Sequence, residues 1–448
     1  MENKHLYIQT FGCQMNVHDS EQIVALLSGS GYRRTDNLKL ADLIILNTCS
    51  IREKAAQKVY SQLGRIKPLK DRNPELIIGV VGCLAQHLGA KFHRRLDYLD
   101  FVAGTHNIHR IPEMIGAIHQ KRRKITEIDF HALPGSMNIF APPDKGQLSA
   151  FVTIMQGCNN FCAYCVVPYL RGREISRPVN EIISEIKKLA DAGIQEVTLL
   201  GQNVNSYGKN LPDGSNFTSL IKKIGEIEGI RRIRFTTSHP RDLSEDLMNC
   251  FATEKKLCAH IHLPVQSGSN HVLRLMNRGY TVEEYMKKID YLRGVNPRMS
   301  ITSDLIVGFP GETEKDYQET IDMMRKIRFD STFSFKYSER EGTAAQKLKD
   351  KVAEDEKLRR LEELQKLQNQ HMLERNTEMV DSLQEILVEG RSKNSDHDLT
   401  GRTSSWKIVN FRCEQDLAGR MVMVKITKAH LHSLRGAIEK NEENIRVD

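Results

Sequence analysis

The sequence predicts an α/β protein with three parts: an N-terminal doubly wound parallel-sheet domain, a central partial (β/α)6 barrel and a small C-terminal all-β domain. Two runs of alternating strands and helices predict the first two parts, because parallel strands need helical crossovers. A Pro-rich stretch separates the runs, and short strands without helices follow the second. The length of 448 residues leaves room for about two to four domains of ordinary size.

The first run contains four expected strands, over 5–10, 41–46, 76–81 and 101–103, with helices over 19–27 and 50–66 between them. The strands ADLIIL at 41–46 and LIIGVV at 76–81 are apolar at nearly every position. Such strands are typical of a parallel sheet that helices cover on both faces. We therefore assign residues 1–130 to an N-terminal domain.

The second run follows an expected linker over 131–147, where HALPGSMNIFAPPDK at 131–145 holds three prolines and shows no period. Strands are expected over 151–155, 196–200, 233–237, 260–264, 301–307 and 332–337, with helices such as 179–192 and 314–327 between them. These six β/α units predict a partial barrel over 148–380. Residues 344–378 are rich in Lys, Glu, Leu and Gln and predict one long surface helix.

The end of the chain changes character, because helical periodicity stops and short strand-like runs take over. These runs cover 382–387, 398–402, 406–411 and 421–428. They predict a small all-β domain over 381–448. Its candidates for one basic face are Arg402, Lys407, Arg412 and Lys425.

Composition excludes several classes of protein. Hydrophobic residues make up 40% and charged residues 27% of the chain, which is ordinary globular usage and excludes wholesale disorder. The mean hydropathy of −0.45 and the lack of an apolar run near ~18 residues exclude an integral membrane protein. The first residues resemble neither a secretory signal nor a transit peptide, so we expect a cytoplasmic protein.

The net charge of +8 permits a polyanionic partner without requiring one. The densest basic clusters are KFHRR at 91–95 and KRRK at 121–124. Each cluster alone is explained more simply as solvated surface charge.

Nine cysteines stand at 13, 49, 83, 158, 162, 165, 250, 258 and 413. An odd number in a long chain of this kind argues against a disulfide framework and favours metal or catalytic use. Cys250 on a helix, Cys258 before a strand and Cys413 near the end are best explained by packing.

The loop cysteines, Cys158, Cys162 and Cys165, have C-x₃-C-x₂-C spacing directly after the first strand of the central region. Three thiolates on one tight loop can hold three irons of a [4Fe–4S] cube and leave the fourth iron open for a substrate. A structural zinc site would need a fourth ligand, and this loop contains no further Cys or His. The spacing therefore favours an open iron–sulfur cluster.

The strand-end cysteines, Cys13, Cys49 and Cys83, are 36 and 34 residues apart and match no local metal motif. Each follows the carboxyl end of an expected parallel strand, and such ends share one edge of an open sheet, where ligands bind. Gly12 and Gly82 beside them allow close backbone approach. Convergence on a second cluster is one interpretation, and three buried cysteines packed as small apolar residues is the other.

The segment CNNFCAYC at 158–165, opening a β/α barrel, resembles the radical S-adenosylmethionine (radical SAM) superfamily. The resemblance implies that the open iron binds the amino and carboxylate groups of S-adenosylmethionine (SAM). It further implies that one electron from the cluster cleaves SAM to a 5′-deoxyadenosyl radical. The SAM-contact residues that it implies are Tyr164, Gln202, Asn203, Gln266 and Asp304. The last four are equally explained as hydrogen-bonded polar groups at a barrel mouth.

A longer series of motifs resembles the methylthiotransferase family: FGCQMN at 11–16, NTCSIREKA at 47–55, VVGC at 80–83 and CNNFCAYC at 158–165. Members of that family join a methylthiotransferase domain, a radical SAM barrel and a C-terminal TRAM domain. The resemblance covers essentially the whole chain. Within the family, the first two motifs are most similar to members that act on dimethylallyladenosine in tRNA.

The resemblance implies methylthiolation of C2 of N6-isopentenyl(dimethylallyl)adenosine at position 37 of tRNA. This carbon is an unactivated C–H, so the chemistry has to come from a cofactor. The loop cysteines would hold a radical [4Fe–4S] cluster and the strand-end cysteines a sulfur-transfer [4Fe–4S] cluster, with two SAM molecules used per turnover. The implied partners of this monomer are a tRNA anticodon loop, an electron donor and a sulfur source. The basic clusters at 91–95 and 121–124 and the C-terminal domain are candidates for phosphate contacts.

Two alternatives stay open at this point. The same machinery could act on another tRNA adenosine derivative or on a ribosomal-protein aspartate, the family's other main class of substrate. A non-enzymatic iron–sulfur protein that binds RNA is the third hypothesis, and it predicts no cleavage of SAM.

Overall fold

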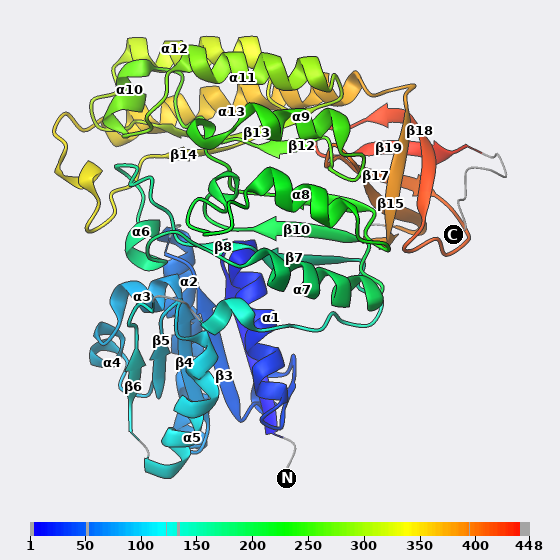
Figure 1. Ribbon diagram of the computed structural model, residues 1–448. Helices are drawn as coiled ribbons and strands as arrows, with labels where there is room; N and C mark the ends of the chain where they lie inside the picture. Colours follow the sequence, from blue (N-terminus) through cyan, green and yellow to red (C-terminus); the bar gives the residue numbers. More distant parts are fainter. Residues whose placement is uncertain (1–3, 51–52, 122, 132–134, 394, 440–448) are drawn as a thin grey trace.

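The computed structural model describes residues 4–50, 53–121, 123–131, 135–393 and 395–439 and shows three domains in contact (Figure 1). Parts of four sequence predictions lie outside these residues. They are residues 51–52 in the second motif and helix, 122 in a basic cluster, 132–134 in the linker, and 394 and 440–448 in the C-terminal domain. No helix within the described residues is long and apolar enough to cross a membrane.

The N-terminal domain holds a six-stranded, fully parallel sheet with the order β2-β1-β3-β4-β5-β6. The strands are β1 (Lys4–Phe11), β2 (Tyr32–Arg34), β3 (Leu43–Thr48), β4 (Ile77–Gly82), β5 (Phe101–Ala103) and β6 (Ile125–Glu127). The sequence did not predict β2 and β6, which are three-residue strands at the two edges. Because β1 lies between β2 and β3, the chain reverses direction across the sheet there, and this switch point opens a crevice at the carboxyl ends of β1 and β3.

Helices cover both faces of this sheet, as the sequence predicts. The helices α1 (Gln14–Ser28) and α5 (Ile111–Lys121) pack on one face, and α2 (Glu53–Arg72), α3 (Cys83–Leu88) and α4 (Lys91–Arg95) pack on the other. Successive residues of β3 alternate between the two cores, so that Ile45 faces α1 while Ile44 faces α2. The doubly wound fold is thereby confirmed.

The central domain is a partial barrel of six parallel strands flanked by helices, which confirms the predicted (β/α)6 architecture. Its strands are β7 (Ser149–Thr153), β10 (Glu196–Leu200), β11 (Arg232–Phe235), β12 (His260–His262), β13 (Ser300–Val307) and β14 (Ser331–Lys336). They form two parallel sheets, β11-β10-β7 and β12-β13-β14, joined by an isolated bridge between Ile233 and Leu257. A short antiparallel pair, β8 (Met155–Gln156) and β9 (Ile175–Ser176), flanks the cysteine loop.

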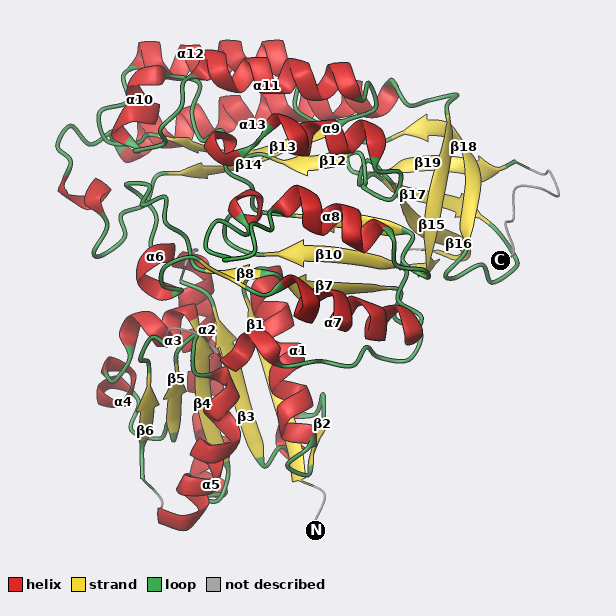
Figure 2. Ribbon diagram, in the orientation of Figure 1, coloured by secondary structure: helices red, strands yellow, loops and turns green. Residues whose placement is uncertain are grey.

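Six helices of the central domain pack on the outside of the strands (Figure 2). They are α7 (Val179–Asp191), α8 (Phe217–Gly225), α9 (Glu245–Thr253), α11 (Val282–Val295), α12 (Glu314–Ile327) and α13 (Glu354–Thr377). Two short helices pack elsewhere, α6 (Val167–Leu170) on Cys83 and α10 (Asn270–Leu275) on a small cluster with Phe309. One prediction is wrong here, because residues 344–378 do not form a single helix. Ala344–Lys347 is a 3-10 turn, Asp350 has a φ of 57°, and the helix α13 begins only at Glu354.

The C-terminal domain is a closed five-stranded barrel with the order β15-β16-β17-β19-β18. Its strands are β15 (Leu383–Ser392), β16 (Ser395–Thr403), β17 (Ile408–Arg412), β18 (Met421–Ala429) and β19 (Leu434–Ile438). The sequence predicted all of these except β19. Figure 2 shows this domain beyond the tail of the β10 arrow, at the amino-terminal ends of the central strands.

Two arginines of β11 fix the C-terminal domain in this position. Arg232 donates to Arg402 O at 2.6 Å, and Arg234 donates to Thr403 O at 2.9 Å. The Arg234 guanidinium also lies 4.4 Å from the centre of the Trp406 ring. The C-terminal domain therefore lies at the amino-terminal ends of the barrel strands, away from their carboxyl ends.

Candidate functional site

The loop cysteines lie on a tight loop at the carboxyl end of β8. Gly157 enters this loop with a φ of 82°, and a Cβ there would collide with the Arg173 carbonyl. The Gly157 N–H donates to Gln202 Oε1 at 2.5 Å, and the Cys165 N–H donates to Cys162 O at 2.9 Å. The loop conformation is thus fixed by backbone contacts and by one residue at the end of β10.

The three loop thiols converge inside the protein. Cys158 and Cys162 are buried and Cys165 is half-buried. Burial raises the pKa of Cys158 to about 11 and that of Cys165 to about 12, and the charge of Cys162 acts on both in the same direction. Thiols within electrostatic range of one another, on a loop of this length, can supply three sulfur ligands to one cluster.

A buried arginine lies against the middle cysteine of this loop. Arg278 Nη1 is 3.4 Å from both Cys162 Sγ and the Tyr164 hydroxyl, and Arg278 Nη2 donates to Pro264 O at 2.6 Å. His239 Nε2 lies 4.0 Å from the same sulfur. Burial, and next the charge of Arg278, lower the pKa of His239 to about 2, so this imidazole is neutral. Of these two groups, only Arg278 therefore places a positive charge beside the Cys162 thiol.

The residues expected to contact SAM lie around the same strand ends. Tyr164 is packed edge-on against Phe309, with ring centres 6.4 Å apart, and Gln202 holds the cysteine loop. Asn203 donates to Asp242 Oδ2 at 2.7 Å, while its Oδ1 atom is buried and has no hydrogen-bond partner. Gln266 has a φ of 74° and accepts a backbone hydrogen bond from Ile306. The Asp304 carboxylate is 3.4 Å from His262 Nε2.

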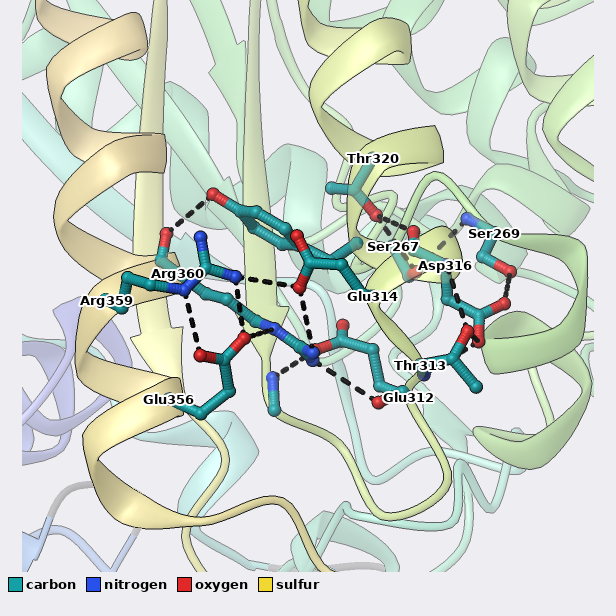
Figure 3. A network of polar contacts seen from close by, with 12 residues as sticks. Ser267, Ser269, Glu312, Thr313, Glu314, Asp316, Thr320, Glu356, Arg359 and Arg360 are labelled. Atoms are coloured by element: carbon teal, nitrogen blue, oxygen red, sulfur yellow. Dashed lines mark hydrogen bonds and ion pairs between the residues drawn. The ribbon is translucent and has the colours of Figure 1, made fainter.

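A polar network holds the loops that follow β12 and β13 (Figure 3). In the loop after Gln266, the Ser269 hydroxyl donates to Asp316 Oδ1 at 2.5 Å. After β13, the buried Glu312 carboxylate accepts from Arg360 of α13 at 2.7 Å. Helices α12 and α13 thereby fix the loops that follow β12 and β13. Asp316 and the Glu312–Arg360 pair are buried, while Glu314 and Arg359 at the outer end of the network are exposed.

The strand-end cysteines occupy the carboxyl ends of β1, β3 and β4, at the switch point of the N-terminal sheet. Cys13 precedes α1 and is exposed, Cys49 follows β3, and Cys83 begins α3. Burial raises the pKa of Cys83 to about 12, against the lowering effect of Arg171, and the charges of Cys49 and Cys13 raise it further. Cys83 is therefore within electrostatic range of both other cysteines.

Two buried asparagines order this edge, and the sequence analysis did not single them out. The Cys13 thiol donates to Asn16 Oδ1 at 3.4 Å, and Asn16 Nδ2 donates to Asn47 Oδ1 at 3.0 Å. Asn47 in turn donates to Ser20 Oγ at 3.0 Å. Asn16 belongs to the motif FGCQMN and Asn47 to the motif NTC. Their position close to a cysteine in the sequence is the signal that could have identified them.

Arg171 joins the two sets of cysteines, and no local pattern in the sequence distinguishes it. It donates to Asp19 Oδ2 on α1 at 2.7 Å, and both side chains are at least 90% buried. Its neighbours Val166 and Leu170 pack directly on Cys83. The six residues after the last loop cysteine are thus inserted into the edge that carries the strand-end cysteines (Figure 1).

Both sets of residues fit the binding of iron–sulfur clusters. No three Cys, His, Asp or Glu side chains of the described residues are close enough to hold a single metal ion. A cube makes a different demand, because each thiolate binds its own iron atom. Each set offers three thiols with a buried guanidinium nearby, which suits an anionic cluster, and the unpartnered Asn203 Oδ1 atom leaves a buried acceptor free for a ligand.

Comparison with known families divides the chain into the same three kinds of domain. Residues 152–324 match the radical SAM superfamily, residues 5–104 match an uncharacterised protein family (UPF0004), and residues 378–438 match the TRAM domain. The match to the radical SAM superfamily makes a [4Fe–4S] cluster and SAM the cofactors of the central domain.

Solved structures show the same fold at low sequence identity. The radical SAM methyltransferase TsrM from Kitasatospora setae, with cobalamin and a [4Fe–4S] cluster bound, has a TM-score of 0.57 and 14% identity, covering 77% of this chain and 74% of its own. The cobalamin-dependent SAM radical enzyme OxsB, with aqua-cobalamin bound, has a TM-score of 0.53 and 13% identity, covering 82% of this chain and 56% of its own.

Curated relatives are similar over nearly the full length. The tRNA-2-methylthio-N(6)-dimethylallyladenosine synthase of Syntrophus aciditrophicus is 59% identical over 436 residues, which are 97% of this chain and 95% of the relative. The enzyme of the same name from Geobacter sulfurreducens is 50% identical over 446 residues, 99% of this chain and 100% of the relative. The chain therefore belongs to the family of tRNA-2-methylthio-N(6)-dimethylallyladenosine synthases.

Proposed function

We propose that this protein methylthiolates C2 of N6-isopentenyl(dimethylallyl)adenosine at position 37 of tRNA. The single observation that carries the proposal is that the segment from Val166 to Arg171, directly after the loop cysteines, packs on Cys83 and bonds Asp19 at the edge of the strand-end cysteines. A radical at the substrate carbon has to meet a sulfur donor before it is quenched, so the two sites must be held together. The names of the full-length relatives supply the substrate.

We assign separate roles to the two sets. The loop cysteines hold the radical cluster and the strand-end cysteines hold a second [4Fe–4S] cluster, which carries the sulfur. When bound, the first cluster and SAM supply the radical chemistry that protein side chains lack, and a second SAM donates the methyl group. Tyr164, Gln202, Asn203, Gln266 and Asp304 are assigned to SAM.

The residues of the chain position and charge-balance these groups. Arg278 places a positive charge against Cys162, which would offset part of the negative charge of a bound cluster. Neutral His239 fills the other side of that sulfur without adding charge. Arg171 has the role of Arg278 at the other set, because its positive charge acts on Cys83 at the domain contact.

The tRNA is assigned to the open side of the strand ends. A loop nucleotide is already poorly paired, so it is turned into a protein site at small cost. The clusters at 91–95 and 121–124 are assigned to phosphates, which position the RNA. Two of the four candidate basic residues of the C-terminal domain are engaged in short ion pairs, Arg402 with Glu389 at 2.7 Å and Lys407 with Asp330 at 3.1 Å. We further propose a monomer that takes electrons and sulfur from outside donors.

The decisive experiment is mass spectrometry of nucleosides. Protein reconstituted under anaerobic conditions is incubated with SAM, reductant, sulfide and tRNA that carries isopentenyladenosine. We expect the 2-methylthio derivative of that nucleoside. Release of 5′-deoxyadenosine without this product would move the substrate to another tRNA adenosine or to a ribosomal-protein aspartate. If intact clusters gave neither product, the protein would be an iron–sulfur RNA-binding protein.

Cysteine variants test the division of roles. We expect Cys162→Ala to abolish release of 5′-deoxyadenosine, because the radical cluster loses a ligand. We expect Cys49→Ala to release 5′-deoxyadenosine but to form no methylthio product. The matched control is Cys413→Ala, a half-buried cysteine of the C-terminal barrel, which should keep both activities. A normal methylthio product from Cys49→Ala would make the second cluster dispensable.

A further inference from the structure

Two phenylalanines of the central barrel are unusually exposed for their position. Phe333 and Phe335 occupy alternate positions of β14, and their exposed fractions are 55% and 37%. A single exposed apolar residue on a surface needs no explanation, but two large rings side by side on one strand of a barrel form an apolar patch. We call these two residues the aromatic pair.

The register of β13 and β14 places the aromatic pair on the inner face of the barrel. Leu305 and Val307 of β13 pack into the core beneath the outer helices, so the alternate residues, Asp304 and Ile306, face inward. Phe333 is the register partner of Asp304, and Phe335 is the partner of Ile306. Partners in parallel strands project from the same face of the sheet, so both rings share the inner face with Asp304.

The inner face beside Phe333 is polar, whereas Ile306 beside Phe335 is apolar. His262 Nδ1 is 3.0 Å from Thr302 Oγ1, and His262 Nε2 is 3.4 Å from Asp304. The Phe333 ring meets the edge of the His262 ring, with centres 6.3 Å apart. The aromatic pair and Ile306 therefore form an apolar patch at the edge strand β14, next to the Asp304 carboxylate assigned to SAM.

We propose that the aromatic pair binds the dimethylallyl group of the target nucleoside and the adjoining face of its adenine. This inference rests on the proposed function and adds a specificity site to it. The full-length relatives are named for dimethylallyladenosine, whose base is flat and uncharged and carries a branched C5 alkenyl group. Phenylalanine rings suit both halves of this ligand, since they stack on bases and bury alkyl groups.

The chemistry of the other candidate ligand does not match the patch. SAM carries an ammonium, a carboxylate and a sulfonium, and these groups need the polar residues at the strand ends. The aromatic pair offers no hydrogen-bond donor or acceptor in its side chains. Its position next to Asp304 brings a base bound there close to the residues assigned to SAM.

The test compares two tRNAs of identical sequence, one with isopentenyladenosine and one with unmodified adenosine at position 37. Binding of each to the reconstituted protein is measured for the wild type, Phe333→Ala, Phe335→Ala and the double variant. We expect the wild type to prefer the prenylated tRNA. We expect the double variant to lose at least about 10–200-fold of that preference, the range for a single methylene group in a hydrophobic pocket. Affinity for SAM should not change, and affinity for unmodified tRNA should fall less than affinity for prenylated tRNA, because only stacking on the adenine is lost there.

Two further variants keep the result interpretable. Phe333→Leu with Phe335→Leu preserves apolar surface and should restore most of the preference for the prenyl group. Leu373→Ala removes an apolar side chain of similar exposure, 45%, from the outer helix α13 and should have no effect. Because the aromatic pair is exposed, truncation leaves no internal cavity, and unchanged melting temperatures verify that the variants fold.

An unchanged preference for prenylated tRNA in the double variant would overturn the inference. Equal loss of SAM binding in the absence of tRNA would overturn it as well, by assigning the pair to SAM. The measurement requires no turnover. A wild type that prefers prenylated tRNA but forms no methylthio product would therefore contradict the proposed reaction and leave the specificity site standing.

Discussion

At the scale of single residues, the site depends on backbone positions that only glycine occupies without strain. Gly157 has a φ of 82° directly before Cys158, and no Cβ fits against the Arg173 carbonyl. Gly82 has a φ of 89° directly before Cys83, and a Cβ there would meet Asn47 and Thr48. Both cysteine sites thus begin at a turn whose left-handed backbone disfavours any other residue.

We predict that Gly157→Ala impairs the radical cluster. The strain of about 1–2 kcal/mol in a left-handed alanine adds to the collision with Arg173 and displaces the loop. The measurement is iron and sulfide content after reconstitution, in protein whose strand-end cysteines are replaced by alanine so that one cluster is counted. Gly146→Ala is the control, because Gly146 has the same φ of 82° with open space around it. Equal iron content in both variants would contradict the argument.

At the scale of elements, helix termini anchor the loops of the site. Thr313 and Asp316 form a capping box at the start of α12, and Asp316 also accepts from Ser269 in the loop after Gln266 (Figure 3). One carboxylate therefore ties a helix start to a site loop. Burial alone would raise the pKa of Asp316, but the hydrogen bonds from Ser269 and Thr313 outweigh it and lower the pKa to about 2.

This lowered pKa predicts a loss of stability in acid. A carboxyl whose folded pKa lies below its unfolded value of about 3.9 stabilises the fold above that pH. The contribution disappears as the pH falls from about 4 to about 2. Asp316→Asn should lower the melting temperature at pH 6, by the equivalent of about 1–2 kcal/mol for a lost cap.

The gap between wild type and Asp316→Asn should narrow as the pH falls from 5 to 3. Asp322→Asn, an exposed carboxylate on the same helix, is the control and should change the melting temperature little at any pH. A gap that stays constant with pH would show that the ionised form of Asp316 is not what stabilises the cap.

At the scale of the whole molecule, the chain brings its two sets of cysteines toward one another by inserting one segment into another domain. Arg171 and Asp19 form a buried ion pair across the domain boundary, and Leu170 packs on Cys83 beside it. At the far end of the barrel, Arg232 and Arg234 fix the C-terminal domain. The domain contacts therefore leave the strand ends and the inner face of the barrel as the approach for a large substrate.

We predict that Arg171→Gln uncouples the two sites. Asp19 is left buried without its partner, at a cost of about 3–5 kcal/mol. The variant should still release 5′-deoxyadenosine but should form little methylthio product, as measured by nucleoside mass spectrometry. Adding Asp19→Asn removes the unpaired charge and should restore the melting temperature. Product formation should stay low in this double variant, and full recovery of product would reduce the ion pair to a purely structural role.

Much of the architecture follows from local signals. The loop cysteines are predicted by spacing because a stretch of eight residues confines their three thiols whatever surrounds them. The strands β3 and β4 are also recognisable from local sequence, because their consecutive apolar residues indicate a strand that is buried on both faces. The short strands β2, β6 and β19 escaped prediction, because three to five residues show too little pattern. The helix over 344–353 was wrongly predicted because this segment has the composition of a helix. Asp350 has a left-handed backbone conformation there, which a helix cannot contain.

The sequence by itself determined the three domain types, the six cysteines and the family. These properties reside in spacing and periodicity, which tertiary contacts do not alter. Only the tertiary structure decided that Arg171 lies between the cysteine sets, that Asn16 and Asn47 order one of them, and that the aromatic pair faces inward. These facts depend on contacts between residues far apart in the chain, and such contacts form only when the domains pack.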